Sequence, residues 1–189
     1  MSSPACRTDG RVRRLGAALL LATSLSAQAA LPVGAAAPDF SADAALGGQP
    51  LRFSLAAELK KGPVVLYFYP KAFTSGCTIE AHLFAEASEQ FKAQGASVVG
   101  ISNDDIDTLK KVSIEACRNK FVVAADAGAK VMKAYDAKLM LMPGTADRIS
   151  YLIGSDGRIA AVYSSLSPEG HVDAMLKAAE RLKSAPGKP

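Results

Sequence analysis

The sequence predicts a single α/β domain, built on a mixed central sheet with helices on both faces. Apolar runs typical of strands alternate with segments of helical periodicity, and a hairpin and a last helix follow. This alternation is typical of a sheet that helices cover on both sides. At 189 residues the chain has room for one sizeable core, and no repeat or linker divides it.

The predicted strands are short apolar runs bounded by turn-forming residues. Residues 64–69 are apolar, β-branched or aromatic and lie between Pro63 and Pro70, which is typical of a strand buried on both faces. Residues 96–101 and 121–125 predict two more strands. Residues 149–153 and 159–163 flank a Gly-Ser-Asp-Gly turn and predict a hairpin. Residues 31–50, rich in alanine, glycine and proline, predict an extended lead-in.

Four helices are predicted between and after these strands. The first spans residues 76–94 and ends at Gly95; its expected apolar face consists of Ile79, Leu83, Ala87 and Phe91. The second begins at a cap formed by Asn103, with Asp104 and Asp105 at the positive end of its dipole. Its expected apolar face consists of Ile106, Leu109, Val112 and Ala116. A short helix over 130–135 and a last one over 168–183 follow, with a frayed tail from Ser184.

Residues 1–30 have the pattern of a cleaved export signal. A basic stretch with Arg11, Arg13 and Arg14 leads into an apolar run over 15–25, and small residues suited to cleavage near Ala29 or Ala30 follow. The apolar run is too short to span a bilayer, and no cysteine follows it that could carry a lipid anchor. The sequence therefore predicts a periplasmic protein whose mature domain spans residues 31–189.

The composition indicates a globular domain without affinity for nucleic acid. Hydrophobic residues make up 49% of the chain and charged residues 21%. The formal net charge of +4 comes largely from the first thirty residues, which hold four arginines and one aspartate. The remaining domain is nearly neutral, so it lacks the basic surface that nucleic-acid binding requires.

Cys77 is the candidate nucleophile, because it lies where the chain leaves a buried strand and enters a helix. Backbone N–H groups and the positive dipole end stabilise a thiolate in the first turn of a helix, and the thiolate is the reactive form. Thr74 can aim its hydroxyl into the same pocket or cap the helix. Pro70 lacks an N–H group and stiffens the loop that shields the sulfur.

These residues carry a resemblance to a known family. The pattern Pro70-x-x-x-Thr74-x-x-Cys77 resembles the active-site motif of peroxiredoxins, and the longer stretch 68–80 is similar to their Q-type, or bacterioferritin-comigratory, branch. The resemblance covers nearly all of residues 31–189. It implies an elaborated thioredoxin-like fold, Cys77 as the peroxidatic cysteine, and attack of its thiolate on a peroxide to give a sulfenic acid.

The same resemblance implies roles for residues outside the motif. Arg148 stands where the family has its active-site arginine, which favours the thiolate and donates to the peroxide oxygens. The expected substrates are hydrogen peroxide and organic hydroperoxides. The expected reductant is a thioredoxin-like or other thiol, and the expected assembly is a monomer or weak dimer. No cofactor or metal is implied.

The sequence departs from the Q-type pattern at three positions. His82 stands five residues after Cys77, where a resolving cysteine is frequent; Ser75 replaces the usual proline, and Phe73 a commonly polar residue. Resolution within the first helix is therefore excluded. Cys117, near the end of the second helix, becomes the candidate resolving cysteine, since some Q-type enzymes carry it there. The resemblance thus implies an intramolecular disulfide between Cys77 and Cys117.

Other interpretations remain open for each residue. Cys77 and Cys117 could be buried thiols without reactivity, Thr74 a simple helix cap, and Arg148 a surface charge. An exported thioredoxin-type disulfide carrier would need a C-x-x-C motif, which Cys77 lacks. A copper-binding module on the same fold would need a second cysteine at Ala81, and the chain's two histidines are too scattered for a metal site.

Overall fold

The computed structural model describes residues 30–184, so the predicted leader (apart from residue 30) and the last five residues lie outside the described part. The elements in chain order are β1 (Ser41–Leu46), β2 (Gln49–Ser54), α1 (Leu55–Leu59), β3 (Val64–Phe68), α2 (Ser75–Glu86), α3 (Ser88–Ala93), β4 (Ser97–Ser102), α4 (Ile106–Glu115), β5 (Val122–Ala125), α5 (Lys130–Ala134), β6 (Ile149–Ile153), β7 (Ile159–Ser164) and α6 (His171–Ser184).

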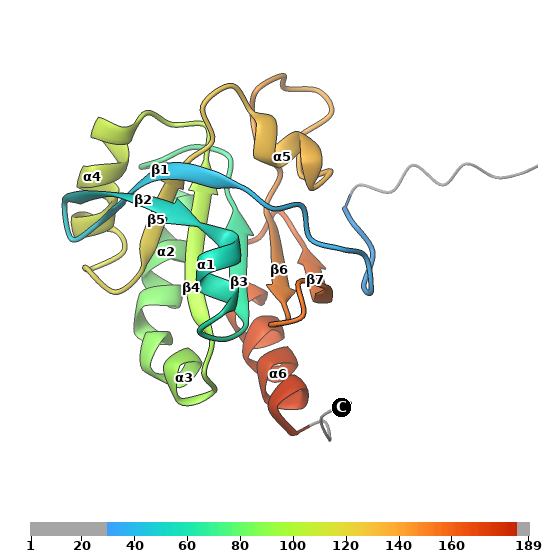
Figure 1. Ribbon diagram of the computed structural model, residues 1–189. Helices are drawn as coiled ribbons and strands as arrows, with labels where there is room; N and C mark the ends of the chain where they lie inside the picture. Colours follow the sequence, from blue (N-terminus) through green and yellow to red (C-terminus); the bar gives the residue numbers. More distant parts are fainter. Residues whose placement is uncertain (1–29, 185–189) are drawn as a thin grey trace, which may run out of the picture.

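The seven strands form one mixed sheet with the order β2-β1-β5-β4-β3-β6-β7. The central strands β3, β4 and β5 are parallel, and β1 and β6 pair antiparallel to either side of them. Figure 1 shows this sheet with helices on both faces, as the sequence predicts. The loops that follow β3 and β4 meet at one edge of the sheet, because the two strands are parallel neighbours. The candidate active site lies at this edge.

Two apolar cores cover the two faces of the sheet, because successive side chains of a strand point to opposite sides. On β3, Val65 and Tyr67 belong to the core under α2, α3, α4 and α6. Leu66 and Phe68 belong to the core under α1 and α5. All five residues of β3 are buried, which explains its continuous apolar run.

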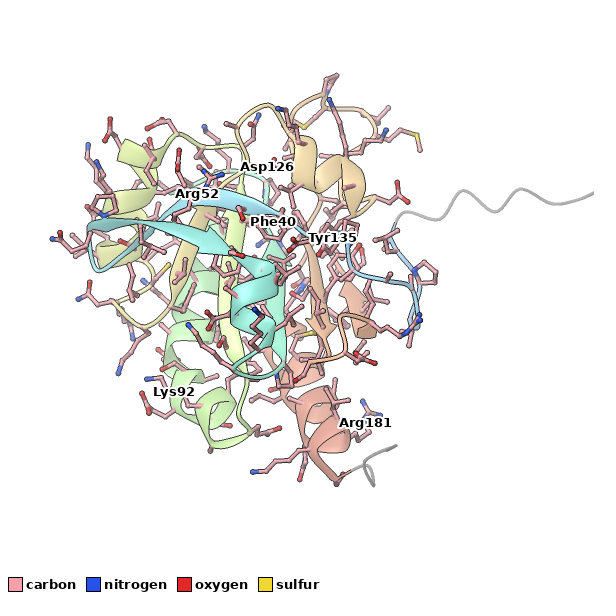
Figure 2. The ribbon with its side chains drawn as sticks, viewed as in Figure 1. Phe40, Arg52, Lys92, Asp126, Tyr135 and Arg181 are labelled. Atoms are coloured by element: carbon pink, nitrogen blue, oxygen red, sulfur yellow. The ribbon has the colours of Figure 1, made fainter. Side chains whose placement is uncertain are left out.

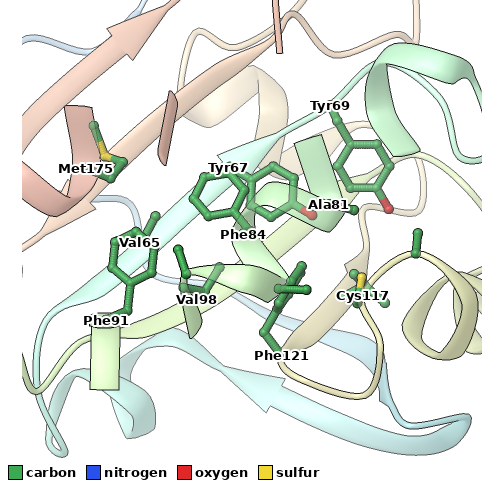
Figure 3. Close-up of a cluster of buried hydrophobic side chains, with 14 of the residues drawn as sticks. Val65, Tyr67, Tyr69, Ala81, Phe84, Phe91, Val98, Cys117, Phe121 and Met175 are labelled. Carbon is green, nitrogen blue, oxygen red and sulfur yellow. The ribbon is translucent and has the colours of Figure 1, made fainter. Parts of the chain in front are cut away.

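Aromatic contacts tie distant segments into these cores. Tyr67 stacks on Phe84 of α2 with ring centroids 4.4 Å apart, a pair that is seen in Figure 3. On the opposite face, Phe40 meets the ring of Tyr135 edge to face at 6.3 Å (Figure 2), and Tyr135 donates a hydrogen bond to the Pro38 carbonyl. The lead-in before β1 is therefore anchored against α5.

The prediction of an extended lead-in over 31–50 is wrong for its second half, because residues 41–50 belong to a hairpin. β1 and β2 pair antiparallel around Gly47-Gly48, and both glycines have the positive φ that a tight hairpin turn requires. The strand signal is weak because the inward residues of β1 are small alanines. The Gly-Gly dipeptide was the available sign of the turn.

The first predicted helix is divided at Ala87 into α2 and α3. Its predicted apolar face is confirmed at Ala87 and Phe91, which are buried, but it is wrong within α2. Ile79 is 45% exposed, whereas Cys77, Glu80, Ala81 and Phe84 are buried. The buried face of α2 includes Glu80, so a prediction based on hydrophobicity alone assigns the wrong face of the helix to the core.

The cap of the second predicted helix also differs. Asp105 is the cap of α4, and its carboxylate accepts from the Thr108 N–H at 2.8 Å. Asn103 instead donates to the Gly144 carbonyl, and Asp104 is buried in the loop before the helix. The expected face of Leu109, Val112 and Ala116 is confirmed as buried.

The core predicts a contrast between two phenylalanines under the same substitution. Phe84 is fully buried and stacked, so Phe84→Ala should lower the free energy of unfolding by about 3–5 kcal/mol. Phe73 is 47% exposed, so Phe73→Ala should change it by no more than about 0.5 kcal/mol. Urea unfolding of both variants measures the difference. Equal losses would contradict this description of the core.

Candidate active site

Cys77 lies in the first turn of α2, at the start of which Thr74 is the capping residue with extended backbone. The sulfur is nearly enclosed, since only 5% of the residue is exposed. The Thr78 N–H donates to the Thr74 carbonyl at 2.9 Å and closes the first turn around Cys77. This position agrees with the expectation that a helix N-terminus faces the thiol.

The loop before Cys77 is held by Asp104, which follows β4. One carboxylate oxygen accepts from the Ala72 N–H at 2.8 Å and from the Ser102 hydroxyl at 2.9 Å. The other oxygen forms an ion pair with Lys71. Because β3 and β4 are parallel neighbours, their following loops meet here, and Asp104 fixes one to the other. Sequence reasoning assigned Asp104 to a helix dipole and missed this role.

Arg148 reaches Cys77 because of the pairing between β3 and β6. Phe68, the last residue of β3, lies opposite Ile149, so residue 148 stands beside the loop that follows β3. The Arg148 Nη2 atom lies 3.5 Å from the Cys77 sulfur, and Nε donates to the Leu166 carbonyl at 3.0 Å. Arg148 is buried, which excludes the alternative of a surface charge.

Glu80 completes the buried charge cluster on the same face of α2 as Cys77. Its carboxylate forms an ion pair with the Nη1 atom of Arg148, and neither side chain is exposed by more than 6%. Burial raises the pKa of Glu80 to about 8, and Arg148 limits the rise. Burial alone would lower the pKa of Arg148, but Glu80 and Cys77 hold it above its usual value. The sequence reasoning gave Glu80 no role, because a glutamate in an amphipathic helix is usually solvent-facing.

Gly76 leaves room for this cluster. A Cβ atom at residue 76 would lie 3.1 Å from the Arg148 Nη2 atom. Even the methyl group of an alanine would therefore press on the guanidinium. The position of Arg148 thus favours glycine at residue 76, directly before Cys77.

Thr74 and Pro70 lie in the loop between β3 and α2, and the hydrogen bond of the Thr74 hydroxyl is made to the backbone and not to the Cys77 sulfur. The Thr74 hydroxyl donates to the Lys71 carbonyl at 3.0 Å, and no side-chain cap of α2 is formed. The suggestion that the Thr74 side chain caps the helix is therefore wrong. Pro70 is partly buried directly after β3. Both residues shape the loop over the thiol.

Cys117 is buried beyond the end of α4 and is a free thiol, as is Cys77. Burial raises the pKa of Cys117 far above that of an ordinary thiol. Figure 3 shows Cys117 in the core near Tyr69 and Ala81. Tyr69 and Ala81, together with Val112 and Ala116 of the segment leading to Cys117, line a small pocket that borders Cys77. Cys77 and Cys117 belong to the same buried cluster of the core.

Comparison with known proteins identifies this arrangement. The family model described as the AhpC/TSA family matches residues 33–162. The chain belongs to the AhpC/TSA family of peroxiredoxins. It is 36% identical over 137 residues to peroxiredoxin Q from Sedum lineare, covering 72% of each chain. It is 32% identical over 192 residues to peroxiredoxin Q from Oryza sativa subsp. japonica, covering 94% of this chain and 86% of the relative.

Solved structures agree with the Q-type assignment. The peroxidoxin BcpB from Mycobacterium tuberculosis superposes with a TM-score of 0.68 at 32% identity, covering 82% of this chain and 98% of that one. The bacterioferritin comigratory protein of Xanthomonas campestris, which has alkyl peroxide reduction activity, superposes with a TM-score of 0.66 at 26% identity, covering 75% of this chain and 92% of that one. The thioredoxin-like fold of a peroxiredoxin is confirmed.

The family establishes a thiol peroxidase, so the disulfide carrier and the binding module are not favoured. Peroxiredoxins act on peroxides and are reduced by thiols. Within residues 30–184, no helix is long and apolar enough to cross a membrane.

The predicted periplasmic location is corrected by the same comparisons. The plant relatives are named chloroplastic, and this finding overturns the periplasmic prediction. Segments rich in arginine and serine and poor in acidic residues are typical of transit peptides as well. The order of basic, apolar and small residues therefore did not separate the two kinds of leader. Residues 1–29 lie outside the described part of the chain.

The contact between Gly76 and Arg148 predicts a catalytic defect without a folding defect. Gly76→Ala should slow oxidation of Cys77 by roughly tenfold, because displacing a positioned group by less than an ångström is costly to catalysis. Stability should not fall, since alanine favours a helix more than glycine does. Ser75→Ala, at the neighbouring exposed position, is the matched control. Stopped-flow oxidation rates and thermal unfolding check both; an unchanged rate in Gly76→Ala would contradict the constraint.

Proposed function

We propose that this peroxiredoxin reduces hydrogen peroxide and organic hydroperoxides with Cys77 as the peroxidatic cysteine and Arg148 as the residue that activates it. The observation that carries the proposal is the buried contact of 3.5 Å between the guanidinium and the sulfur. A guanidinium at this distance favours the thiolate over the thiol. Its charge is also placed to stabilise the oxygen that leaves as the O–O bond breaks.

The first step is attack of the Cys77 thiolate on the terminal peroxide oxygen. A sulfur–oxygen bond forms, the O–O bond breaks, and the departing hydroxide or alkoxide takes a proton from water to leave as water or alcohol. Cys77 is oxidised to a sulfenic acid. In this proposal Thr74 and Pro70 shape the loop that admits the peroxide, because both follow β3 directly before the helix.

The second step of the proposal is resolution by Cys117. The Cys117 sulfur attacks the Cys77 sulfenic acid, a disulfide forms, and water leaves with the thiol proton. The buried Cys117 thiol must first be exposed, because burial disfavours its thiolate. A disulfide also requires Cα atoms within about 7 Å, and in this proposal the segment that carries Cys117 moves toward Cys77 to meet that limit.

The backbone after α4 supports such a movement. Arg118 and Asn119 both have positive φ, at 50° and 59°, although neither is glycine. Side chains other than glycine disfavour this conformation by roughly 1 kcal/mol each, so the turn after Cys117 is strained. Unwinding the segment that follows Val112 would release the strain and free Cys117.

A thioredoxin-like dithiol protein is the proposed reductant of the Cys77–Cys117 disulfide, with the described domain acting as a monomer or weak dimer. The reductant supplies two electrons and becomes oxidised to its own disulfide. Exposed Phe73 and Ile79 flank Cys77 in the sequence and offer apolar contacts for docking.

The two cysteines predict different outcomes when they are replaced. Cys77→Ser should abolish peroxide consumption, because serine keeps the volume but not the thiolate. Cys117→Ser should keep the first oxidation and stop turnover with thioredoxin, so that Cys77 accumulates as sulfenic or sulfinic acid. After one equivalent of peroxide, peptide mass spectrometry of the unmodified sequence should show a Cys77–Cys117 cross-link. A free Cys117 beside an oxidised Cys77 would make this a one-cysteine enzyme.

A further inference from the structure

One oxygen of the buried Glu80 carboxylate has no hydrogen-bond partner. Oε2 pairs with Arg148, but Oε1 is enclosed and unpaired. His171, at the start of α6, faces this oxygen, and its Nδ1 atom lies 3.6 Å from Oε1. An unpaired oxygen of a buried carboxylate is costly, so this one calls for an explanation.

The other contacts of His171 determine whether its Nδ1 atom can donate a hydrogen bond to Glu80. The ring is fully buried, and its Nε2 atom lies 3.0 Å from the Ser165 carbonyl. A carbonyl only accepts, so Nε2 carries a hydrogen. The Nδ1 atom lies 2.8 Å from the Ser150 hydroxyl, which can donate or accept. In a neutral ring, Nδ1 is then an acceptor that faces a second acceptor, the Glu80 oxygen.

We propose that Glu80 and His171 share one proton in the reduced enzyme, and that this proton leaves the charge of Arg148 available to the Cys77 thiolate. A proton between Oε1 and Nδ1 would satisfy the unpaired oxygen. His171 is thus a positioning residue that acts through Glu80 and Arg148. The inference rests on the proposed roles of Cys77 and Arg148.

The charges around the sulfur show why this proton matters. Arg148 stands between the Cys77 thiolate and Glu80. With the shared proton, the Glu80–His171 pair has no net charge, and Arg148 balances the thiolate. Without it, Glu80 cancels Arg148, and the thiolate is left as a buried charge without compensation.

The other titratable groups near the pair form no hydrogen bond to the Glu80 Oε1 atom. Among them, Tyr67 of β3 is buried, and burial raises its pKa well above its usual value, so it keeps its proton. Tyr163 of β7 packs its ring edge-to-face against His171 at 4.8 Å. Asp147 precedes Arg148 and accepts from the Arg148 backbone N–H. Glu169, in the loop before α6, is exposed and bound to the Ser167 hydroxyl. The Ser150 hydroxyl on β6 completes the surroundings.

Burial shifts the pKa values of both Glu80 and His171 toward their uncharged forms. It raises the pKa of Glu80 to about 8 and lowers the pKa of His171. Both shifts favour the uncharged forms, a carboxylic acid beside a neutral imidazole. In this proposal the pair shares one proton across the 3.6 Å between Oε1 and Nδ1, and that proton should be lost at mildly alkaline pH.

The test is the pH profile of Cys77 oxidation by hydrogen peroxide, measured by stopped flow in the Cys117→Ser protein. The rate constant should fall by roughly tenfold between about pH 7 and pH 10, as loss of the shared proton cancels the charge of Arg148. Glu80→Gln should remove this alkaline fall, since its amide donates to Nδ1 at every pH. His171→Asn should move the fall to lower pH, because a fixed amide donor stabilises the Glu80 carboxylate.

His82→Asn, which changes the chain's other histidine on the outer part of α2, should leave the profile as it is. A merely structural role of Glu80 would lower the rate at every pH and keep the shape of the profile. That result, or a profile of the Cys117→Ser protein that is flat to pH 10, overturns the inference. Slow oxidation of Cys77 at every pH in the Cys117→Ser protein would instead overturn the proposed function.

Discussion

The guanidinium of Arg148 is buried between two acidic partners, the Cys77 sulfur and the Glu80 carboxylate. Burying a guanidinium is costly unless its charge is paired and its N–H groups are hydrogen-bonded. Much of the surrounding structure supplies these partners. The register of β3 with β6 places residue 148 beside the loop after β3, and the Leu166 carbonyl accepts a hydrogen bond from Nε. Gly76 has no Cβ atom and so leaves room for Nη2. Cys77, Arg148 and Glu80, the proposed nucleophile, its activating cation and the counter-charge of that cation, are thereby brought together from two segments far apart in the sequence.

Much of this fold could be predicted from the sequence because its central strands are buried on both faces. A continuous apolar run such as β3 predicts both the strand and its central place. The hairpin of β1 and β2 was missed, since buried alanines give almost no periodic signal. The face of α2 was misassigned for the opposite reason. Glu80 points inward, and only the arginine that it binds, remote in sequence, makes that orientation favourable.

The site was predictable where chemistry is local and not where it depends on long-range packing. Cys77 at a helix start is a local signal, and Arg148 followed from the family resemblance. The roles of Asp104, Glu80 and His171 depend on which loops and helices meet, which sequence spacing does not reveal. The location was misjudged because export signals and transit peptides share basic and small residues, so the pattern of residues 1–30 does not separate them.

The central claim is that the charge of Arg148 makes Cys77 reactive toward peroxide. It is tested most directly by adding Arg148→Met to the Glu80→Gln protein, so that loss of the guanidinium does not leave a buried Glu80 carboxylate without its partner. Oxidation of Cys77 by hydrogen peroxide is then compared between the single and double variants at the same pH. The account predicts a rate constant lower by on the order of a hundredfold in the double variant, comparable to the loss of one oxyanion-stabilising donor. Equal rates in the two proteins would contradict it.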